Sequence, residues 1–263
     1  MYYLSISSIF RQETPWLVEW LDYHIACGVE HFYLYNNDDD PTDASRILRP
    51  YVERGVVDEI LMPGRFMQMP SMQDVVSRFG DRTYWLALID LDEFFLPKRT
   101  NVISEILENY ESFGALAIHW HIFGTNGYRQ SPPNQLNYLL RRAEKSNDLH
   151  HFVKSIVRPH SVISEKMVTP HIFPLRSGYA VNENFEPVTT AYAPSITASV
   201  IRLNHYCLRS RQDYVEVKCR RGLGTPSLHE RDERFWVHYD RNEVFDDEIS
   251  KRFGCVISEP SPT

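Results

Sequence analysis

Short apolar runs typical of strands alternate with amphipathic runs typical of helices along the first third of this chain. The predicted strands are residues 2–10, 31–35, 56–61 and 85–89, and the predicted helices are residues 15–27, 42–54 and 73–79. Strands joined in this way lie parallel in one sheet, because right-handed crossovers place the helices on both of its faces. The chain of 263 residues is therefore expected to form an α/β fold with a mostly parallel central sheet.

Three carboxylates follow the fourth predicted strand within four positions, at Asp90, Asp92 and Glu93. Since side chains alternate along a strand, the two aspartates are expected on one face, with Glu93 pointing the other way. Ligands bind open α/β sheets at the carboxyl ends of strands, and paired carboxylates favour Mg²⁺ or Mn²⁺. A D-x-D tripeptide is usually a solvated turn, but here it stands between an apolar strand and the pair Phe94 and Phe95. We interpret it as a metal site that carries a substrate phosphate.

Several classes of protein are disfavoured by what the chain lacks. No G-x-G-x-x-G follows the first predicted strand and no G-x-x-x-x-G-K-[ST] occurs, which argues against a dinucleotide-binding fold and a P-loop kinase. The formal net charge of -7 argues against a nucleic-acid partner, since such proteins normally carry a basic excess.

The spacing of the cysteines and the hydropathy of the chain indicate the cellular compartment. Cys27, Cys207, Cys219 and Cys255 show no C-x-x-C spacing, so we expect reduced thiols rather than a zinc site or a disulfide scaffold. We find no leader sequence and no apolar run of ~18 residues. A cytoplasmic protein without a transmembrane segment is expected, with peripheral contact at the inner face of a membrane left open.

The remainder of the chain is less regular, because prolines break it into short pieces. A single domain over residues 1–263 is expected, in which the regular half is about 1–125 and the irregular half about 126–255, followed by a flexible tail at 256–263. Within these halves we expect a short helix at 102–110, strands at 114–123 and 203–206, and a basic helix at 211–221.

The chain resembles glycosyltransferases of the GT-A fold, specifically the family-92-like and family-2-like proteins. The resemblance rests on the order and spacing of RQETPWLVEWLDYHIACGVEHFYLYNN, LIDLDEFF, HWHIFGTNGY, VKSIVRP and LNHYCLRS. It implies a Rossmann-like GT-A sheet, with a nucleotide-sugar-binding first half and an acceptor-side second half. The implied reaction moves a hexose, with inversion, from a nucleotide-diphosphate sugar, UDP-sugar above all, to a glycan or lipid-linked acceptor in polysaccharide biosynthesis.

The resemblance also implies how a metal is held. The D-x-D aspartates of the family contact a divalent cation that bridges the donor diphosphate. Asp92 is then the direct ligand of Mn²⁺ or Mg²⁺, Asp90 faces the ribose or the metal, and His205 completes the metal or diphosphate site. Taken alone, a histidine between asparagine and tyrosine is more often a packed or surface residue.

On the nucleotide side, this chain departs from the family at two places. The family's acid at the end of the second strand falls on Asn36, with Asp43 matching a second acid, and Gln12-Glu13 stands where the family commonly has Asn-Glu. The implied donor-binding residues are Arg11, Glu13, Asn36, Asp43, Gln73, Asp90 and Arg209. One or two members of a basic run are expected to neutralise the departing diphosphate, although such runs are usually solvated; its members are Arg209, Arg211, Lys218, Arg220 and Arg221.

An inverting transfer also needs a carboxylate that accepts the proton of the acceptor hydroxyl. The resemblance points to Glu183 or Glu186, with Glu165 behind them, although each reads otherwise as a surface acid. Trp120 and His121 are expected to line the acceptor pocket because aromatic faces stack on sugar rings, and Trp120 fits the core equally well.

Two other functions stay open at this point. A metal-dependent phosphodiesterase or nucleotidyltransferase would also use clustered acids, but it normally has further acids or histidines for a second metal, and these are not evident. A non-catalytic nucleotide-sugar-binding module would keep the aspartates and lack the base.

Overall fold

The computed structural model describes residues 1–221 and 231–254, so Cys255 and the predicted tail at 256–263 lie outside the described residues. Twelve strands occur in these two segments. They are β1 (Tyr2–Phe10), β2 (His31–Asn36), β3 (Val57–Leu61), β4 (Thr83–Leu88), β5 (Glu93–Pro97), β6 (Ala115–Ile122), β7 (Arg141–Arg142), β8 (Val153–Val157), β9 (Ala180–Val181), β10 (Pro187–Val188), β11 (Ile201–His205) and β12 (Val244–Phe245).

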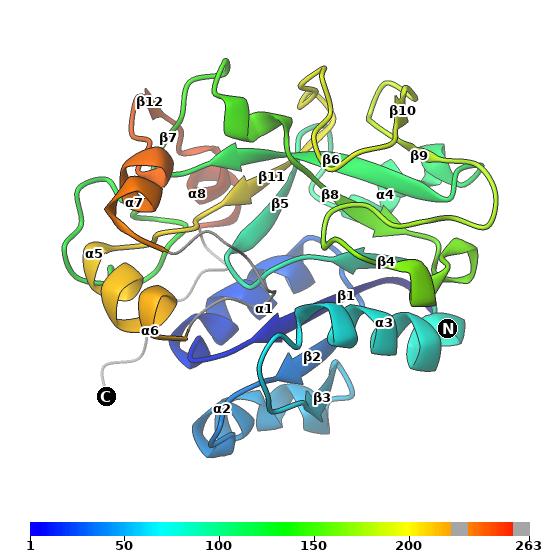
Figure 1. The fold of residues 1–263 in the computed structure, drawn as a ribbon, viewed down its shortest axis with the longest axis horizontal. Helices are drawn as coiled ribbons and strands as arrows, with labels where there is room; N and C mark the ends of the chain where they lie inside the picture. Colours follow the sequence, from blue (N-terminus) through cyan, green and yellow to red (C-terminus); the bar gives the residue numbers. More distant parts are fainter. Residues whose placement is uncertain (222–230, 255–263) are drawn as a thin grey trace.

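A ten-stranded sheet crosses the molecule in the order β10-β9-β6-β8-β4-β1-β2-β3, and β11 extends it by pairing with both β6 and β5 (Figure 1). The first four strands, β1 to β4, are mutually parallel. The predicted α/β class with a mostly parallel central sheet is confirmed. Several strands in the irregular half were not predicted, and the longest of these is β8, which runs antiparallel between β4 and β6.

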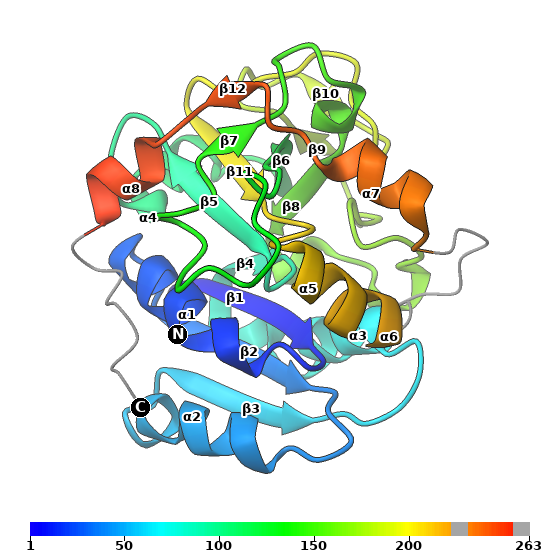
Figure 2. The ribbon, with the colours of Figure 1, turned by 90° about the vertical axis from the view of Figure 1, so that its left-hand side faces the viewer.

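The helices cover both faces of this sheet, with α1 and α3 on opposite sides (Figure 2). The predicted helix at 73–79 begins earlier, at Gln68, and the predicted basic helix at 211–221 is present with a π-helical turn at Tyr214–Lys218 in its middle. The helices are α1 (Leu17–Ala26), α2 (Thr42–Glu53), α3 (Gln68–Phe79), α4 (Ile103–Leu107), α5 (Arg211–Asp213), α6 (Cys219–Arg221), α7 (Glu233–Tyr239) and α8 (Glu248–Phe253).

Strand β4 illustrates why its sequence is continuously apolar. Trp85 and Ala87 pack into the core that contains α1 and α2, whereas Leu86 and Leu88 pack into the core that contains α3. A strand buried on both faces has no polar side to present, as parallel sheets covered by helices require. The core thus fixes the position of the chain up to the acidic tripeptide that follows.

Among the helices of residues 1–221 and 231–254, none combines the length and the apolar character that a membrane crossing requires.

Candidate active site

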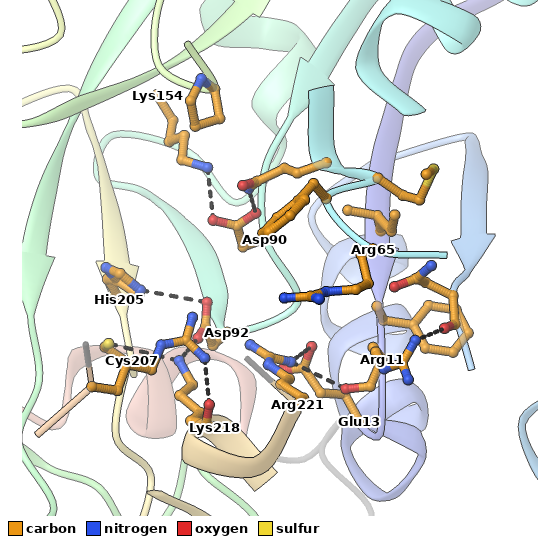
Figure 3. A pocket seen from close by; sticks show the side chains of 18 of the residues that line it. Arg11, Glu13, Arg65, Asp90, Asp92, Lys154, His205, Cys207, Lys218 and Arg221 are labelled. Carbon is orange, nitrogen blue, oxygen red and sulfur yellow. Dashed lines mark hydrogen bonds and ion pairs between the residues drawn. The ribbon is translucent and has the colours of Figure 1, made fainter. Parts of the chain in front are cut away.

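Asp90 and Asp92 lie in a turn between β4 and β5, at the carboxyl end of the parallel strands. The backbone N–H of Glu93 donates to the carbonyl of Asp90 at 3.1 Å, which closes this turn. Both aspartates line one cavity of about 800 Å³ (Figure 3). Both side chains can face this cavity because they belong to the turn. Strand β4 has ended at Leu88, so the alternation of side chains along a strand no longer applies to them.

Asp90 is held by two side chains from different elements. Lys154 of β8 donates from Nζ to Oδ2 at 2.8 Å, and Gln68, at the start of α3, donates from Nε2 to Oδ1 at 3.0 Å. Burial raises the pKa of Asp90, but the ammonium of Lys154 outweighs it and holds that pKa below its ordinary value. Burial lowers the pKa of Lys154, and the carboxylates of Asp90 and Glu93 then raise it to about 12.

Strand alternation predicted that Glu93 points away from the two aspartates, and this prediction is wrong. It is fully buried, its Oε2 accepts from the backbone N–H of Asp90 at 2.9 Å, and it lies 3.5 Å from Nζ of Lys154. Burial raises its pKa to about 7, and Lys154 opposes that rise. The reason for the difference is the turn, which folds Glu93 back so that one lysine serves two carboxylates.

Asp92 lies between two other cations. The sheet brings His205 to it, because β11 pairs antiparallel with β5 so that His205 stands opposite Glu93. Nε2 of His205 is 3.4 Å from Oδ1 of Asp92, and Nζ of Lys218 bonds its Oδ2. Burial raises the pKa of Asp92, but Lys218 and His205 hold it well below its ordinary value.

His205 itself is a cation in this arrangement. Burial lowers its pKa, yet the carboxylate of Asp92 raises it to about 10. The thiol of Cys207 lies 3.6 Å from Nζ of Lys218. Burial raises the pKa of this thiol, and Lys218 together with His205 lowers it below the ordinary value. The imidazolium, the ammonium and the thiol therefore form one coupled group around Asp92.

Glu13 lines the cavity beyond the end of β1, between two arginines. It accepts from Nη1 of Arg209 at 2.9 Å and pairs with Arg221 of α6. Arg209 does not line the cavity, contrary to the donor-binding role that the resemblance implies: it is 1 % exposed and donates to the carbonyl of Leu91 at 3.3 Å. Its guanidinium lies 3.8 Å from the ring of Trp16. Arg209 thus supports the D-x-D turn from the protein interior.

Basic side chains outnumber acidic ones around the cavity. Within the described part of the chain, the carboxylates that line it are those of Glu13, Asp90 and Asp92, whereas seven lysines and arginines do so. These are Arg11, Arg65, Lys154, Lys218, Arg220, Arg221 and Arg231. A local basic excess in a chain of net charge -7 creates a positive potential suited to an anionic ligand.

Aromatic residues form another part of the wall. Trp120, His171, Phe235 and Tyr239 line the cavity. The ring of Trp120 lies 4.4 Å from that of His205, and its indole N–H is buried without a hydrogen-bond partner among the described residues. His121 does not line the cavity with Trp120; it is buried against His150, with ring centroids 4.7 Å apart, because side chains alternate along β6.

Besides Arg209, three further residues that the resemblance assigns to the donor do not line the cavity. Asn36 is buried and donates to Glu59 at 2.8 Å, and Asp43 is exposed on α2, 3.7 Å from Arg46. Gln73 donates to the carbonyl of Met167 at 3.3 Å. Gln68, one helical turn and a residue earlier on α3, lines the cavity instead and lies beside Asp90.

The glutamates expected as bases are also elsewhere. Glu183 is buried, and its carboxylate accepts from Ser199, Val200 and Ile201 at 2.7 to 3.2 Å. This carboxylate satisfies backbone donors at the entry to β11. Glu186 accepts from Asn182 at 2.7 Å. Neither glutamate, nor Glu165, lines the cavity with the aspartates.

The donor set around the aspartates fits a divalent cation that shares its coordination with a ligand. Oδ1 of Asp92 is buried with no hydrogen-bond partner among the described residues, although Nε2 of His205 lies 3.4 Å away, and both carboxylates supply hard oxygen atoms. Within residues 1–221 and 231–254, no group of three acidic, histidine or cysteine side chains is arranged to hold a metal by itself. Mg²⁺ and similar ions are commonly bound by one or two carboxylates plus substrate phosphates, so a diphosphate would complete the site.

Comparison with known proteins identifies the family of this chain. The family Glycosyltransferase family 92 matches residues 1–241. The chain belongs to glycosyltransferase family 92. It is 26 % identical over 217 residues to the Glycosyltransferase family 92 protein At1g27200 of Arabidopsis thaliana, covering 77 % of this chain and 35 % of that relative. The chain therefore spans about a third of the length of this curated relative.

A second relative carries an activity in its name. The Galactan beta-1,4-galactosyltransferase GALS3 of Arabidopsis thaliana is 27 % identical over 122 residues, which are 43 % of this chain and 24 % of that protein. Among solved structures, HddC from Yersinia pseudotuberculosis aligns over 82 % of this chain and 97 % of that one, with a TM-score of 0.41 and 11 % identity. Family 92 membership supports glycosyl transfer as the class of reaction.

Proposed function

We propose that this family 92 chain transfers a hexosyl group from a nucleotide-diphosphate sugar, with UDP as the favoured nucleotide, to a glycan or lipid-linked acceptor. The observation that carries the proposal is the cavity: Asp90 and Asp92 face a space of about 800 Å³ that seven lysines and arginines also line. A diphosphate with a divalent cation has the charge and the size for such a space, and a cavity of several hundred Å³ is ordinary for a small-molecule site.

The proposed reaction breaks the bond between the sugar carbon and the diphosphate, so negative charge develops on the leaving oxygen. Mn²⁺ or Mg²⁺ shared by Asp90, Asp92 and the diphosphate would stabilise that charge. Arg65 and Arg220 are exposed at the cavity and make no ion pair within the described part of the chain, so they are suited to hold phosphate oxygens. Figure 3 shows Arg65 extending toward the space between Asp90 and Asp92, with Arg221 below it beside Glu13.

The protein's own residues prepare the aspartates for this role. Lys154 and Gln68 fix the two oxygens of Asp90, and His205 and Lys218 keep Asp92 ionised. Because Lys154 and His205 are buried and held by strands β8 and β11, little reorganisation of these two side chains is needed when charge develops, which is the condition for effective electrostatic stabilisation. Trp120 and Tyr239 offer apolar faces on which a sugar ring can stack.

Thermal shift with UDP, GDP and CMP, each with and without Mn²⁺, tests the proposal. We expect UDP to raise the melting temperature only when Mn²⁺ is present, because ligand binding to the folded state stabilises it. No shift with any nucleotide would overturn the proposal.

Slow hydrolysis of the donor distinguishes an enzyme from a binding module. UDP-galactose is the first donor to test, since a relative is named as a galactosyltransferase. Release of UDP at a rate that depends on Mn²⁺ supports the enzyme, and binding without release indicates a module. Cleavage within the diphosphate, giving UMP, would instead indicate a phosphodiesterase.

A further inference from the structure

The two lysines beside the D-x-D aspartates differ in how they are anchored. Resting on the function proposed above, we propose that Lys218 is an exchangeable cation. In the nucleotide-free protein it neutralises Asp92, and when metal and donor bind it moves to the diphosphate. Lys154, by contrast, keeps its partners throughout.

Lys154 is held beside its two carboxylate partners by the strand that carries it. It projects from β8, which is paired with β4 on one side and β6 on the other, and its side chain is 1 % exposed. It serves Asp90 at 2.8 Å and Glu93 at 3.5 Å together. Glu93 is fully buried, so removal of this ammonium would leave its carboxylate without a cation, and uncompensated buried charges are costly. Lys154 is therefore a permanent counter-ion.

Lys218 is held differently. Its partner Asp92 has a second cation, His205, on the other carboxylate oxygen, so Asp92 stays neutralised on one side if Lys218 departs. Lys218 ends a π-helical turn at Tyr214–Lys218, a geometry less regular than the α-helix and frequent at functional sites. The helix itself stays docked, because Arg221 of α6 pairs with Glu13. The ammonium can thus swing without undocking its helix.

The charges require such an exchange. A divalent cation on Asp92 would stand within a few ångströms of the Lys218 ammonium, and like charges at that range repel strongly in a partly desolvated site. The diphosphate that arrives with the metal offers Lys218 a new anionic partner in the same cavity, which Lys218, Arg220 and Arg221 all line. Lys218 therefore weakens the binding of the metal alone and strengthens the binding of the nucleotide together with the metal.

Titration calorimetry on the folded, nucleotide-free protein tests this with opposite expectations for two ligands. For Lys218→Gln we expect Mn²⁺ alone to bind about tenfold more tightly than in the wild type, because the competing charge is gone. In the presence of Mn²⁺ we expect UDP to bind the same variant about tenfold more weakly, because a phosphate contact is gone. Lys218→Arg, which retains the charge, should move neither affinity in these directions.

Two matched lysine variants serve as controls. Lys154→Gln should lower the melting temperature, because Asp90 and Glu93 lose the cation that they share. Lys98→Gln should change neither affinity, because Lys98 pairs with Glu248 and does not line the cavity.

The outcomes separate the two proposals. Unchanged or weaker Mn²⁺ binding by folded Lys218→Gln, or unchanged UDP binding, overturns the exchange while the proposed function stands. A wild-type protein that binds neither Mn²⁺ nor UDP overturns both. If Lys218→Gln does not fold, a crystal of the wild type with UDP and Mn²⁺ decides: we expect Lys218 on a phosphate oxygen and Lys154 still on Asp90. Lys218 still paired with Asp92 in that crystal would contradict the inference.

Discussion

At the scale of single residues, the carboxylates of the candidate site are paired with separate cationic side chains. Asp90 and Glu93 share Lys154, whereas Asp92 has Lys218 and the protonated His205. Three carboxylates within four positions would otherwise raise one another's pKa and lose the charge that a metal requires. The lysines that prevent this come from β8 and from the helix after β11.

Asp92→Asn should lower the rate of sugar transfer by roughly a thousandfold, because a single charge contact at ~4 Å is worth about 4 kcal/mol at an effective dielectric of 20. The measurement is donor turnover with saturating Mn²⁺, with circular dichroism to establish that the variant is folded. Asp43→Asn is the matched control, since Asp43 is exposed on α2 and outside the cavity, and it should retain wild-type turnover. Retained turnover in Asp92→Asn would remove the metal role from this residue.

Arg209→Met should reduce the free energy of unfolding by about 3 kcal/mol, because it breaks a buried ion pair and frees the carbonyl of Leu91. Urea denaturation measures this. Arg211→Met, two residues along, should change stability by less than about 0.5 kcal/mol, because that arginine is 41 % exposed in its pair with Glu233. Equal stabilities of the two variants would contradict the supporting role of Arg209.

At the scale of elements, the start of α3 and the identity of β8 decide which side chains reach the aspartates. Helix α3 begins at Gln68 without a side-chain cap, so the sequence offers no clear signal for that start. Strand β8 is short, and its lysine interrupts an apolar run, VKSIV. A lysine fully enclosed in a central strand is itself a sign of a carboxylate partner, since buried charges are paired.

A pair of glutamines on α3 tests this placement. Gln68→Ala should lower the turnover by about tenfold, because a hydrogen bond to a charged group contributes about 1.5 kcal/mol. Gln73→Ala should leave turnover within about twofold, since Gln73 bonds Met167 away from the cavity, and both substitutions have the same effect on helix propensity. Steady-state kinetics on the two variants is the measurement. A larger loss in Gln73→Ala would restore the sequence-based assignment.

At the scale of the whole molecule, the core buries several histidines in their neutral form. Burial lowers the pKa of His24 to about 3 and that of His150 to about 4. In the unfolded chain the pKa of each histidine is near 6.5, so below that pH the unfolded chain binds more protons than the folded chain. The stability these groups contribute is complete above pH 6.5 and is lost as the pH falls toward 4.

Stability should therefore fall by about 2 kcal/mol for each such histidine between pH 7 and pH 5. Urea denaturation at a series of pH values measures the slope. His150→Gln should show a shallower slope than the wild type, since one titrating group is removed. An unchanged slope in His150→Gln would show that this histidine titrates freely in the folded protein; the wild-type slope also contains the opposite contribution of Glu93, whose raised pKa adds stability as the pH falls.

By itself, the sequence determined the alternating first half, the burial of the fourth strand on both faces, and the pair Asp90 and Asp92 at its carboxyl end. These features follow from local patterns, since periodicity and the order of elements restrict a sheet to few topologies. The family resemblance, too, lay within the sequence.

The tertiary structure alone decided which residues surround the aspartates. Lys154, Gln68 and Lys218 meet them through contacts between elements far apart in sequence, whereas Asn36, Gln73 and Glu183, which the resemblance suggested, point to other partners. The physical reason is that a side chain's direction depends on the register of its strand or the start of its helix. A shift of one residue in the register of the strand or in the start of the helix turns the side chain toward a different neighbour.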